Sequence, residues 1–245
     1  MTTADAVRRR LGLGRLLPLG EAADGAWLTE QAAGEVLRIA AGGVADMELG
    51  KVRLGLIDPE TAAVPAVPPP PSALPPGPLR IEAELAVTAL RPLAAVTDAL
   101  RRALFSAARD TLGLAVEAVD LRVTALLETA GAGGGRGARH GPPAAEPAGA
   151  TGGEEGAGAV SGTAFRAGTG AADAVGRAVA SVPGVAEPGA ALGPAVRLAA
   201  DHVRVEVATA PGHYPPAVAR AVRTAVSGAL GDDRPVSVLV TRVSV

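Results

Sequence analysis

Residues that could support chemistry are few in this sequence, and they are far apart. The chain has no cysteine and three histidines, His140, His202 and His213. Without cysteine the chain has no disulfides, thiolate metal ligands or cysteine nucleophile. Only His202 has an adjacent carboxylate, Asp201, and no histidine has a second ligand at the spacing of zinc sites. The sequence therefore predicts no metal site and no catalytic histidine.

The run Gly133–Gly137 is the nearest approach to a nucleotide-binding loop. A phosphate-binding loop follows a strand, precedes a helix and ends in Lys-Ser or Lys-Thr. This run instead lies in a glycine-, alanine- and proline-rich stretch, 129–163, which we interpret as a disordered linker. Signatures of hydrolases, zinc proteases, dinucleotide-binding enzymes and kinases are also missing. We predict no catalytic or cofactor-binding residues, no cofactor and no enzymatic activity.

Two pairs of opposite charges, Arg80 with Glu82 and Arg204 with Glu206, occur in the two halves of the chain. Both pairs alternate with apolar residues, which is typical of a strand with one buried face. Charged residues at such positions face outward and are usually solvated. We interpret the pairs as solvated strand faces with cross-strand ion pairs, each worth roughly a few tenths of a kcal/mol.

The elements that carry these charges have a recognisable order. Apolar and polar residues alternate over 79–88 and over 119–125, which predicts two strands. Between them, apolar residues recur at helical spacing over 93–107, and Gly113 marks the expected end of that helix. The same order of strand, helix and strand closes the chain over 203–245.

Short sequence matches indicate that the pattern is a repeat. We predict an α+β fold of two tandem small domains, each ordered helix-strand-strand-helix-strand. Each domain would have a three-stranded mixed sheet covered by helices on one face. The matches pair Val52-Arg53-Leu54 with Val196-Arg197-Leu198, Arg80-Ile81-Glu82 with Arg204-Val205-Glu206, Ala99-Leu100-Arg101 with Ala221-Val222-Arg223, and Thr124 with Thr241.

The repeat and the composition set the expected domain boundaries. We expect a flexible N-terminal arm over 1–26, a first domain over 27–128, the linker over 129–163 and a second domain over 164–245. A short surface or partner-binding helix is the alternative structure for the arm, and a disordered arm is favoured. No apolar run reaches the roughly 18 residues of a membrane span.

An insert over 58–78 distinguishes the first domain, and it contains the proline run Pro68–Pro71. Such a run adopts polyproline II conformation and is either a docking site for a proline-binding groove or, as we favour, an exposed enlarged loop. Trp27, the only tryptophan, precedes the predicted helix cap Thr29. We expect it to pack against that helix.

The composition disfavours nucleic-acid binding. The formal charge is −2, the isoelectric point is about 6.0 and aromatic residues make up 2% of the chain. An RNA-binding α+β module needs a basic face and stacking aromatics. RNA binding is kept as the alternative function, and a small-molecule enzyme or transporter accessory, which would need a polar pocket, is a third.

Each predicted domain resembles the alkaline shock protein 23 family, also called the Gls 24 type of envelope stress proteins. Gly43-Val44 and Gly184-Val185 resemble that family's turn after the first helix. Thr111-Leu112-Gly113-Leu114, followed by a valine-rich strand, resembles its closing step. The sequence departs from the family in being doubled and in carrying the insert. It also has Gly231–Arg234 where the second closing step is expected.

The resemblance implies a non-enzymatic cytoplasmic protein, peripheral to the cell membrane. It would act as a self-associating scaffold in the envelope stress response, held by a small membrane anchor protein. The implied partners are that anchor and further copies of the chain, with no nucleic acid and no membrane span of its own. Three strands covered on one face leave the other face and both edges open, and we expect Leu239 and Val245 on the open side.

Overall fold

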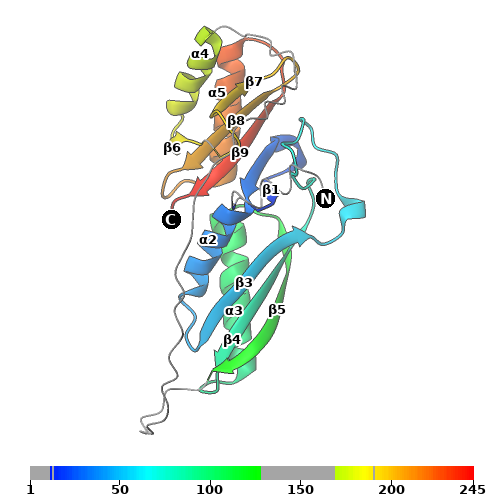
Figure 1. Ribbon diagram of the computed structural model, residues 1–245, viewed down its shortest axis with the longest axis vertical. Coiled ribbons are helices and arrows are strands. Elements are labelled where there is room, and N and C mark those ends of the chain that lie inside the picture. The colour runs from blue at the N-terminus through cyan, green and yellow to red at the C-terminus, as the bar shows by residue number, and fades with distance from the viewer. Residues whose placement is uncertain (1–11, 13, 128–168, 190) are drawn as a thin grey trace, which may run out of the picture.

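The computed structural model describes residue 12 and residues 14–127, 169–189 and 191–245. These residues form a mixed α+β structure with four α-helices and two β-sheets, which confirms the predicted class. Figure 1 shows the sheet formed by strands within 47–127 below and the sheet that contains the C-terminal strands above. The predicted linker, 129–163, lies outside the described residues. No described helix is both long enough and apolar enough to cross a bilayer.

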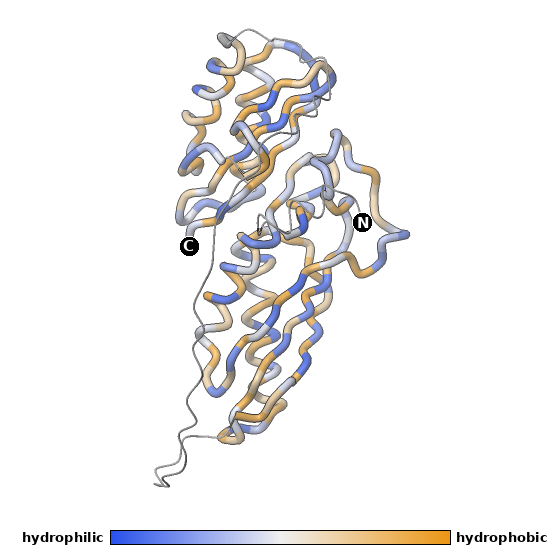
Figure 2. Tube along the Cα trace, viewed as in Figure 1, coloured by the Kyte–Doolittle hydropathy of each residue, from blue (hydrophilic) through white to orange (hydrophobic). Residues whose placement is uncertain are grey.

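The first sheet is three-stranded and mixed, as predicted. Its order is β3-β4-β5. β3 (Met47–Leu56) pairs antiparallel with β4 (Leu79–Thr88), which pairs parallel with β5 (Val116–Leu127). Two helices, α2 (Glu30–Ala41) and α3 (Leu93–Ser106), lie on one face of it (Figure 1). The alternating hydropathy along these strands, visible in Figure 2, sorts apolar side chains toward the helices.

Local signals place the helix ends close to where the sequence predicts them. The Thr29 side chain caps α2 by accepting a hydrogen bond from the Ala32 N–H at 3.3 Å. The second helix, α3, continues at its C-terminal end as a π-helical turn, Ala107–Thr111. Gly113 follows with φ 73° and lies against Pro216 of the other half, so a side chain there would collide.

The second sheet has six strands, not the predicted three. β8 and β9 pair in parallel at its centre, and β6 and β7 both pair antiparallel with β8. β1 and β2 come from the N-terminus and add to β9. Two helices, α4 (Thr169–Ala180) and α5 (Pro215–Leu230), pack on the sheet. The strands are β1 (Leu16–Leu19), β2 (Ala26–Thr29), β6 (Val185–Pro188), β7 (Val196–Leu198), β8 (Val203–Thr209) and β9 (Val236–Val243).

The expectation of a flexible arm over 1–26 is wrong for its described C-terminal part. β1 and β2 form an antiparallel hairpin around the short 3-10 helix η1 (Ala22–Asp24), and every residue of both strands is buried. β2 pairs in parallel with β9. The prediction failed because leucines after arginines suggested an unpacked tail, whereas the hairpin that they form docks through β2 on β9, at the far end of the chain.

The insert is also more than an exposed loop. It contains a second 3-10 helix, η2 (Pro59–Thr61), and closes on itself through a hydrogen bond from the Ala63 N–H to the Pro76 carbonyl. The Leu74 N–H donates to the Leu16 carbonyl at 2.8 Å. The insert is therefore packed on the hairpin, and its prolines support this packing by restricting the loop.

Both sheets share two unusual local features. Thr124 and Thr241 are each an extra residue in the last strand, and each donates its hydroxyl to the long strand, to Leu85 and Val207 respectively, at 3.2 Å. A glycine lies against a glutamate in each half. Gly50 packs on Glu84, and Gly189 packs on Glu206.

The observed register corrects the sequence matches in the long strands. Val52 pairs with Ala83, and Val196 pairs with Val205, so Ala83 corresponds to Val205. The sequence matched Ile81 with Val205, which is two residues off. An offset of two residues still matches buried positions with buried positions, because side chains along a strand alternate between its faces with period two.

Buried side chains of both halves form one continuous apolar cluster, which runs from α2 and β4 to β8 and β9. A separate small cluster joins Leu16, Trp27, Val67 and Leu239 on the other face of the second sheet. The two halves thus share their core.

Candidate functional site

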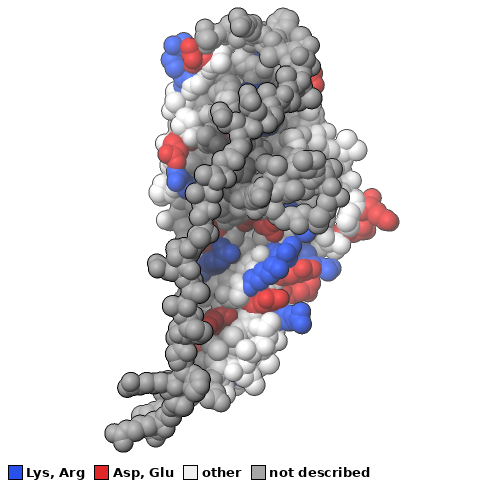
Figure 3. All heavy atoms as spheres, viewed as in Figure 1, with Lys and Arg blue, Asp and Glu red and all other residues white. Residues whose placement is uncertain are grey.

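The face of the first sheet away from its helices is the most distinctive exposed surface in the described residues. Along β4, Arg80, Glu82 and Glu84 alternate with fully buried apolar residues. Figure 3 shows Lys and Arg side chains beside Asp and Glu over this sheet. The prediction of a charged outward face is confirmed here.

Strand register arranges these charges in rows across the sheet. Glu82 lies between Arg53 of β3 and Asp120 of β5, and Glu84 pairs with Arg122. The Arg80 Nε lies 3.2 Å from an Asp120 carboxylate oxygen, with both side chains well exposed. A hollow on this face is lined by Lys51, Arg53, Glu82, Ala83, Glu84, Asp120, Leu121 and Arg122.

Interleaved charges of both signs suit a polar interaction surface. Basic and acidic side chains are present in similar numbers, so the face has no large net charge. They are Lys51, Arg53, Arg80 and Arg122, with Glu82, Glu84 and Asp120. Exposed pairs of this kind contribute little to stability, but they fix the register of a partner that matches them.

The equivalent face of the second sheet is covered, which contradicts the expected solvated strand. Glu206 is 0% exposed and Arg204 is 7% exposed. The segment between β6 and β7 crosses over them. The Leu192 N–H donates to the Glu206 carboxylate at 3.0 Å, and the Gly189 N–H donates to the Glu206 carbonyl. Arg204 Nη2 lies 3.5 Å from Glu206 Oε1, so the two charges are paired in the interior.

Trp27 and Leu239 are also covered, by residues of the insert and by Leu192. Trp27 does not pack on α2 as predicted; it packs with Leu16, Val67 and Leu239, and its indole N–H donates to the Leu74 carbonyl at 3.1 Å. Leu239 is fully buried and is not part of an open face. Leucine suits this position because β9 is covered on both faces, which alternation alone cannot reveal.

The outer edge of β9 is closed by the N-terminal hairpin. The Val238 N–H donates to the Gly25 carbonyl at 3.0 Å. Two arginines of α5 reach the same hairpin: Arg223 donates to the Ala23 carbonyl, and Arg220 lies 3.7 Å from the Asp24 carboxylate. This strand edge is therefore paired within the chain over Val238–Val240.

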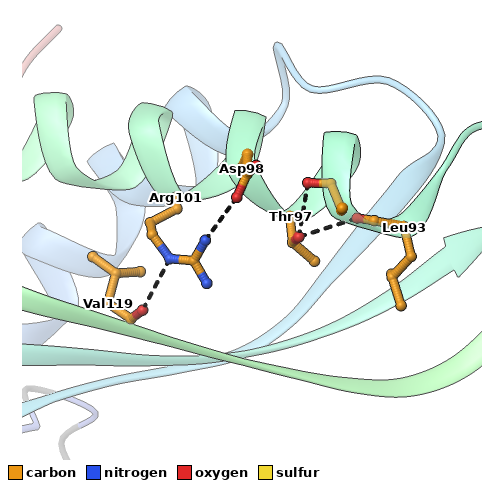
Figure 4. Close-up of polar contacts among 6 residues, drawn as sticks. Leu93, Thr97, Asp98, Arg101 and Val119 are labelled. Carbon is orange, nitrogen blue, oxygen red and sulfur yellow. Dashed lines mark hydrogen bonds and ion pairs between the residues drawn. The ribbon is translucent and has the colours of Figure 1, made fainter.

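The corresponding edge of β5 has no paired strand in the described residues. Instead, Arg101 of α3 donates from Nε to the Val119 carbonyl at 3.4 Å, and its Nη1 binds Asp98 at 3.0 Å (Figure 4). The sequence matched Arg101 with Arg223 but gave neither a role. Their shared position beside the last strand of each half becomes visible only when helix and strand are packed.

A second hollow lies where the halves meet, lined by Asp110, Thr111, His213, Tyr214 and the chain end. The Tyr214 hydroxyl donates to the Arg109 carbonyl at 3.4 Å, and Asp110 accepts a 2.6 Å hydrogen bond from Ser106. The Tyr214 hydrogen bond links the two halves, whereas the Ser106 hydrogen bond is local to the end of α3. Val245, expected on the open sheet face, is exposed in this hollow instead.

The remaining histidines make local contacts. The His202 Nδ1 lies 2.8 Å from an Asp201 oxygen, and this hydrogen bond lowers the pKa of Asp201. His213 Nδ1 lies 3.1 Å from the Pro211 carbonyl. Within the described part of the chain no group of three or more His, Asp or Glu side chains is arranged to hold a metal. His140 lies outside the described residues.

Comparison with known proteins identified no relative of this chain. No family model matches it, and neither the curated proteins nor the solved structures contain a match.

Proposed function

We propose that the chain consists of two diverged tandem copies of one α-β-β-α-β unit, over 27–128 and 164–245. The support is local and specific: a threonine bulge, a glycine packed on a glutamate and an identical Val-Arg-Leu strand occupy equivalent register positions in both sheets. Three independent features at equivalent positions are better explained by a common origin of the two units than by chance. The N-terminal hairpin is then an addition that only the second copy's sheet receives.

We further propose that the protein is a non-enzymatic scaffold that associates with itself and acts at the inner membrane surface. The observation that carries this proposal is the exposed, charge-patterned face of β3, β4 and β5 beside an unpaired edge. Surfaces of this kind recruit partners through matched charges and strand addition. The cytoplasmic location, the membrane anchor partner and the envelope stress role rest on the resemblance to the alkaline shock protein 23 family.

RNA binding is the weaker candidate on this surface. β3, β4 and β5 contain no aromatic residue, so the open face offers no platform on which bases could stack. Trp27 is buried, and the charges on the face are mixed in sign. A protein that binds RNA through a sheet needs exposed aromatic side chains and a basic face.

The test is a pull-down of the tagged chain from native membranes in mild detergent, with mass spectrometry of the recovered proteins. We expect a small membrane protein in near-equal amount. Glu82→Lys, on the charged face, should reduce that recovery, whereas Glu60→Lys, an exposed change in the insert, should not. Recovery of RNA, or of no membrane protein, would contradict the scaffold proposal.

A further inference from the structure

The two halves differ in one respect that points to a partner. The last strand of the second sheet, β9, is covered along its outer edge by β2, whereas no described strand covers β5. An uncovered edge strand in a sheet exposes backbone groups that can pair with another chain. We propose, building on the self-association proposed above, that two copies of this chain pair through β5, antiparallel and centred on Leu121.

The backbone of β5 is oriented for this pairing. The Val119 carbonyl points to the outer edge, where Arg101 binds it. In β9 the residue equivalent to Leu121 is Val238, and its N–H also points outward, to Gly25. Backbone groups alternate sides along a strand, so Val119, Leu121 and Val123 present their N–H and C=O groups outward. These residues match their own copies when the two-fold axis passes through Leu121.

Charge complementarity selects the antiparallel arrangement and this register. Asp120 and Arg122 flank Leu121 and share the helix-free face. An axis through Leu121 places Asp120 of each copy opposite Arg122 of the other, at a position where side chains lie closest. A shift of two residues would lose both pairs. The two charged faces would join into one surface, with both sets of helices on the other side.

Arg101 fits this arrangement as a removable cover. It occupies the Val119 carbonyl only through a partly buried, 3.4 Å hydrogen bond, and its ion pair with Asp98 is exposed. Its counterpart Arg223 instead binds the backbone of the hairpin that covers β9. Pairing of two β5 strands replaces the Arg101 contact with a backbone hydrogen bond.

Charge exchange tests the register in the full chain by sedimentation across a concentration series. Asp120→Arg and Arg122→Asp each place like charges opposite one another twice per dimer, so each should raise the dimer dissociation constant roughly tenfold or more. The double variant Asp120→Arg/Arg122→Asp should restore dimerisation. Lys51→Glu, an exposed charge reversal on the same face at the opposite strand, should leave it unchanged.

Crosslinking tests the geometry directly, because the natural chain has no cysteine. A mixture of Asp120→Cys and Arg122→Cys chains should form a disulfide-linked dimer on oxidation. Either variant alone should not, since its cysteines lie on a diagonal beyond the usual disulfide range. Near-native circular dichroism of each variant would show that it is folded.

The outcomes separate this proposal from the scaffold proposal. Oligomers that persist unchanged in every variant, with no mixed disulfide, would overturn the β5 pairing and leave self-association standing. A chain that is monomeric at all concentrations would overturn both. A membrane partner that is lost with Asp120→Arg and not regained with the double variant would assign the edge to that partner and overturn pairing between copies.

Discussion

Two threonines lie at β-bulges in the parallel strand pairs and bind the neighbouring strand through their hydroxyl groups. Thr124 and Thr241 are the extra residues of the bulges, and their hydroxyls donate to the Leu85 and Val207 carbonyls at 3.2 Å. A bulge disrupts the strand ladder locally, and a side-chain donor compensates for a lost backbone partner. Thr124 is exposed and Thr241 is partly buried, so water can replace the first hydroxyl more easily.

Replacing Thr241 by valine keeps the branched shape and removes the donor. We expect Thr241→Val to lower the free energy of unfolding by about 1 kcal/mol, since the Val207 carbonyl loses a partner in a partly buried site. Thr124→Val is the matched control and should cost less. Urea unfolding of both variants measures the difference, and equal stability of Thr241→Val and the natural chain would contradict the assigned role.

Asp232 gives the protein a small dependence on pH. Arg234 donates to its carboxylate at 2.8 Å, which lowers the pKa of Asp232 below its ordinary value of 3.8. A group whose pKa is lower in the folded state stabilises the fold above its unfolded pKa and loses that effect as pH falls through the folded pKa.

We therefore expect Asp232→Asn to be slightly less stable than the natural chain at pH 7, and the difference to vanish as pH falls from about 4. Asp233→Asn, at the neighbouring exposed carboxylate, is the control for the loss of one negative charge. Urea midpoints measured between pH 2.5 and 7 decide the matter. A difference that grows on acidification would have the wrong sign for this interaction.

At the scale of elements, the same helix-strand arrangement has two outcomes. α5 and β9 carry a docked hairpin, and α3 and β5 carry an arginine in its place. Charged side chains at an exposed edge are a common protection against strand pairing. β9 is also covered on both faces, by α5 on one and by the Trp27 cluster on the other, so apolar residues on both faces are buried.

Arg101→Ala removes the side chain that covers the Val119 carbonyl. We expect the variant to dimerise at concentrations several-fold lower than the natural chain, because the β5 edge no longer has to release the arginine. Arg102→Ala, an exposed neighbour on the same helix, should behave as the natural chain. Sedimentation equilibrium measures both, and weaker dimerisation of Arg101→Ala would show that Arg101 holds the partner strand instead.

On the scale of the whole molecule, the N-terminal hairpin joins the two halves. β2 pairs with β9 and is continuous with α2 of the first half. Glu30 accepts hydrogen bonds from the Leu54 and Arg15 N–H groups, at 3.0 Å each, and so ties the hairpin to β3. With the shared apolar cluster and the Tyr214 contact, these links couple both sheets in one folding unit.

Trp27 reports on this coupling because it is the only tryptophan and lies against Leu239 of β9. We expect its fluorescence and the far-ultraviolet circular dichroism to change in one coincident urea transition. A fluorescence transition at clearly lower urea would mean that the hairpin detaches before the sheets unfold.

Leu239→Ala tests the same contact from the other side. The cavity beneath Trp27 should cost about 2–5 kcal/mol and shift the tryptophan emission to longer wavelength. Val245→Ala, at an exposed apolar residue, is the control and should change neither property. An unchanged emission in Leu239→Ala would contradict the packing of Trp27 on β9.

The amino-acid sequence by itself determined the local elements of this protein. Alternation marked β4 and β5, helical spacing marked α3, and Thr29 marked the start of α2, because these signals depend on neighbours in the chain. The repeated Val-Arg-Leu segment lies in a strand in each half, in β3 and in β7, and each of these pairs antiparallel with the strand that follows. The register of the long strands was misjudged by two residues, since period-two patterns match equally well at either position.

Only the tertiary structure decided what covers each face and edge. An amphipathic pattern shows which side of a strand is buried, but the covering element is set by packing between residues distant in sequence. Glu206 resembles the partly exposed Glu84 in its local pattern and is nevertheless fully buried by the segment before β7. Arg101 and Arg223 match in sequence, yet one covers its own strand and the other a docked hairpin. Their roles differ because the free energy of an edge depends on which strand, if any, is available to pair with it.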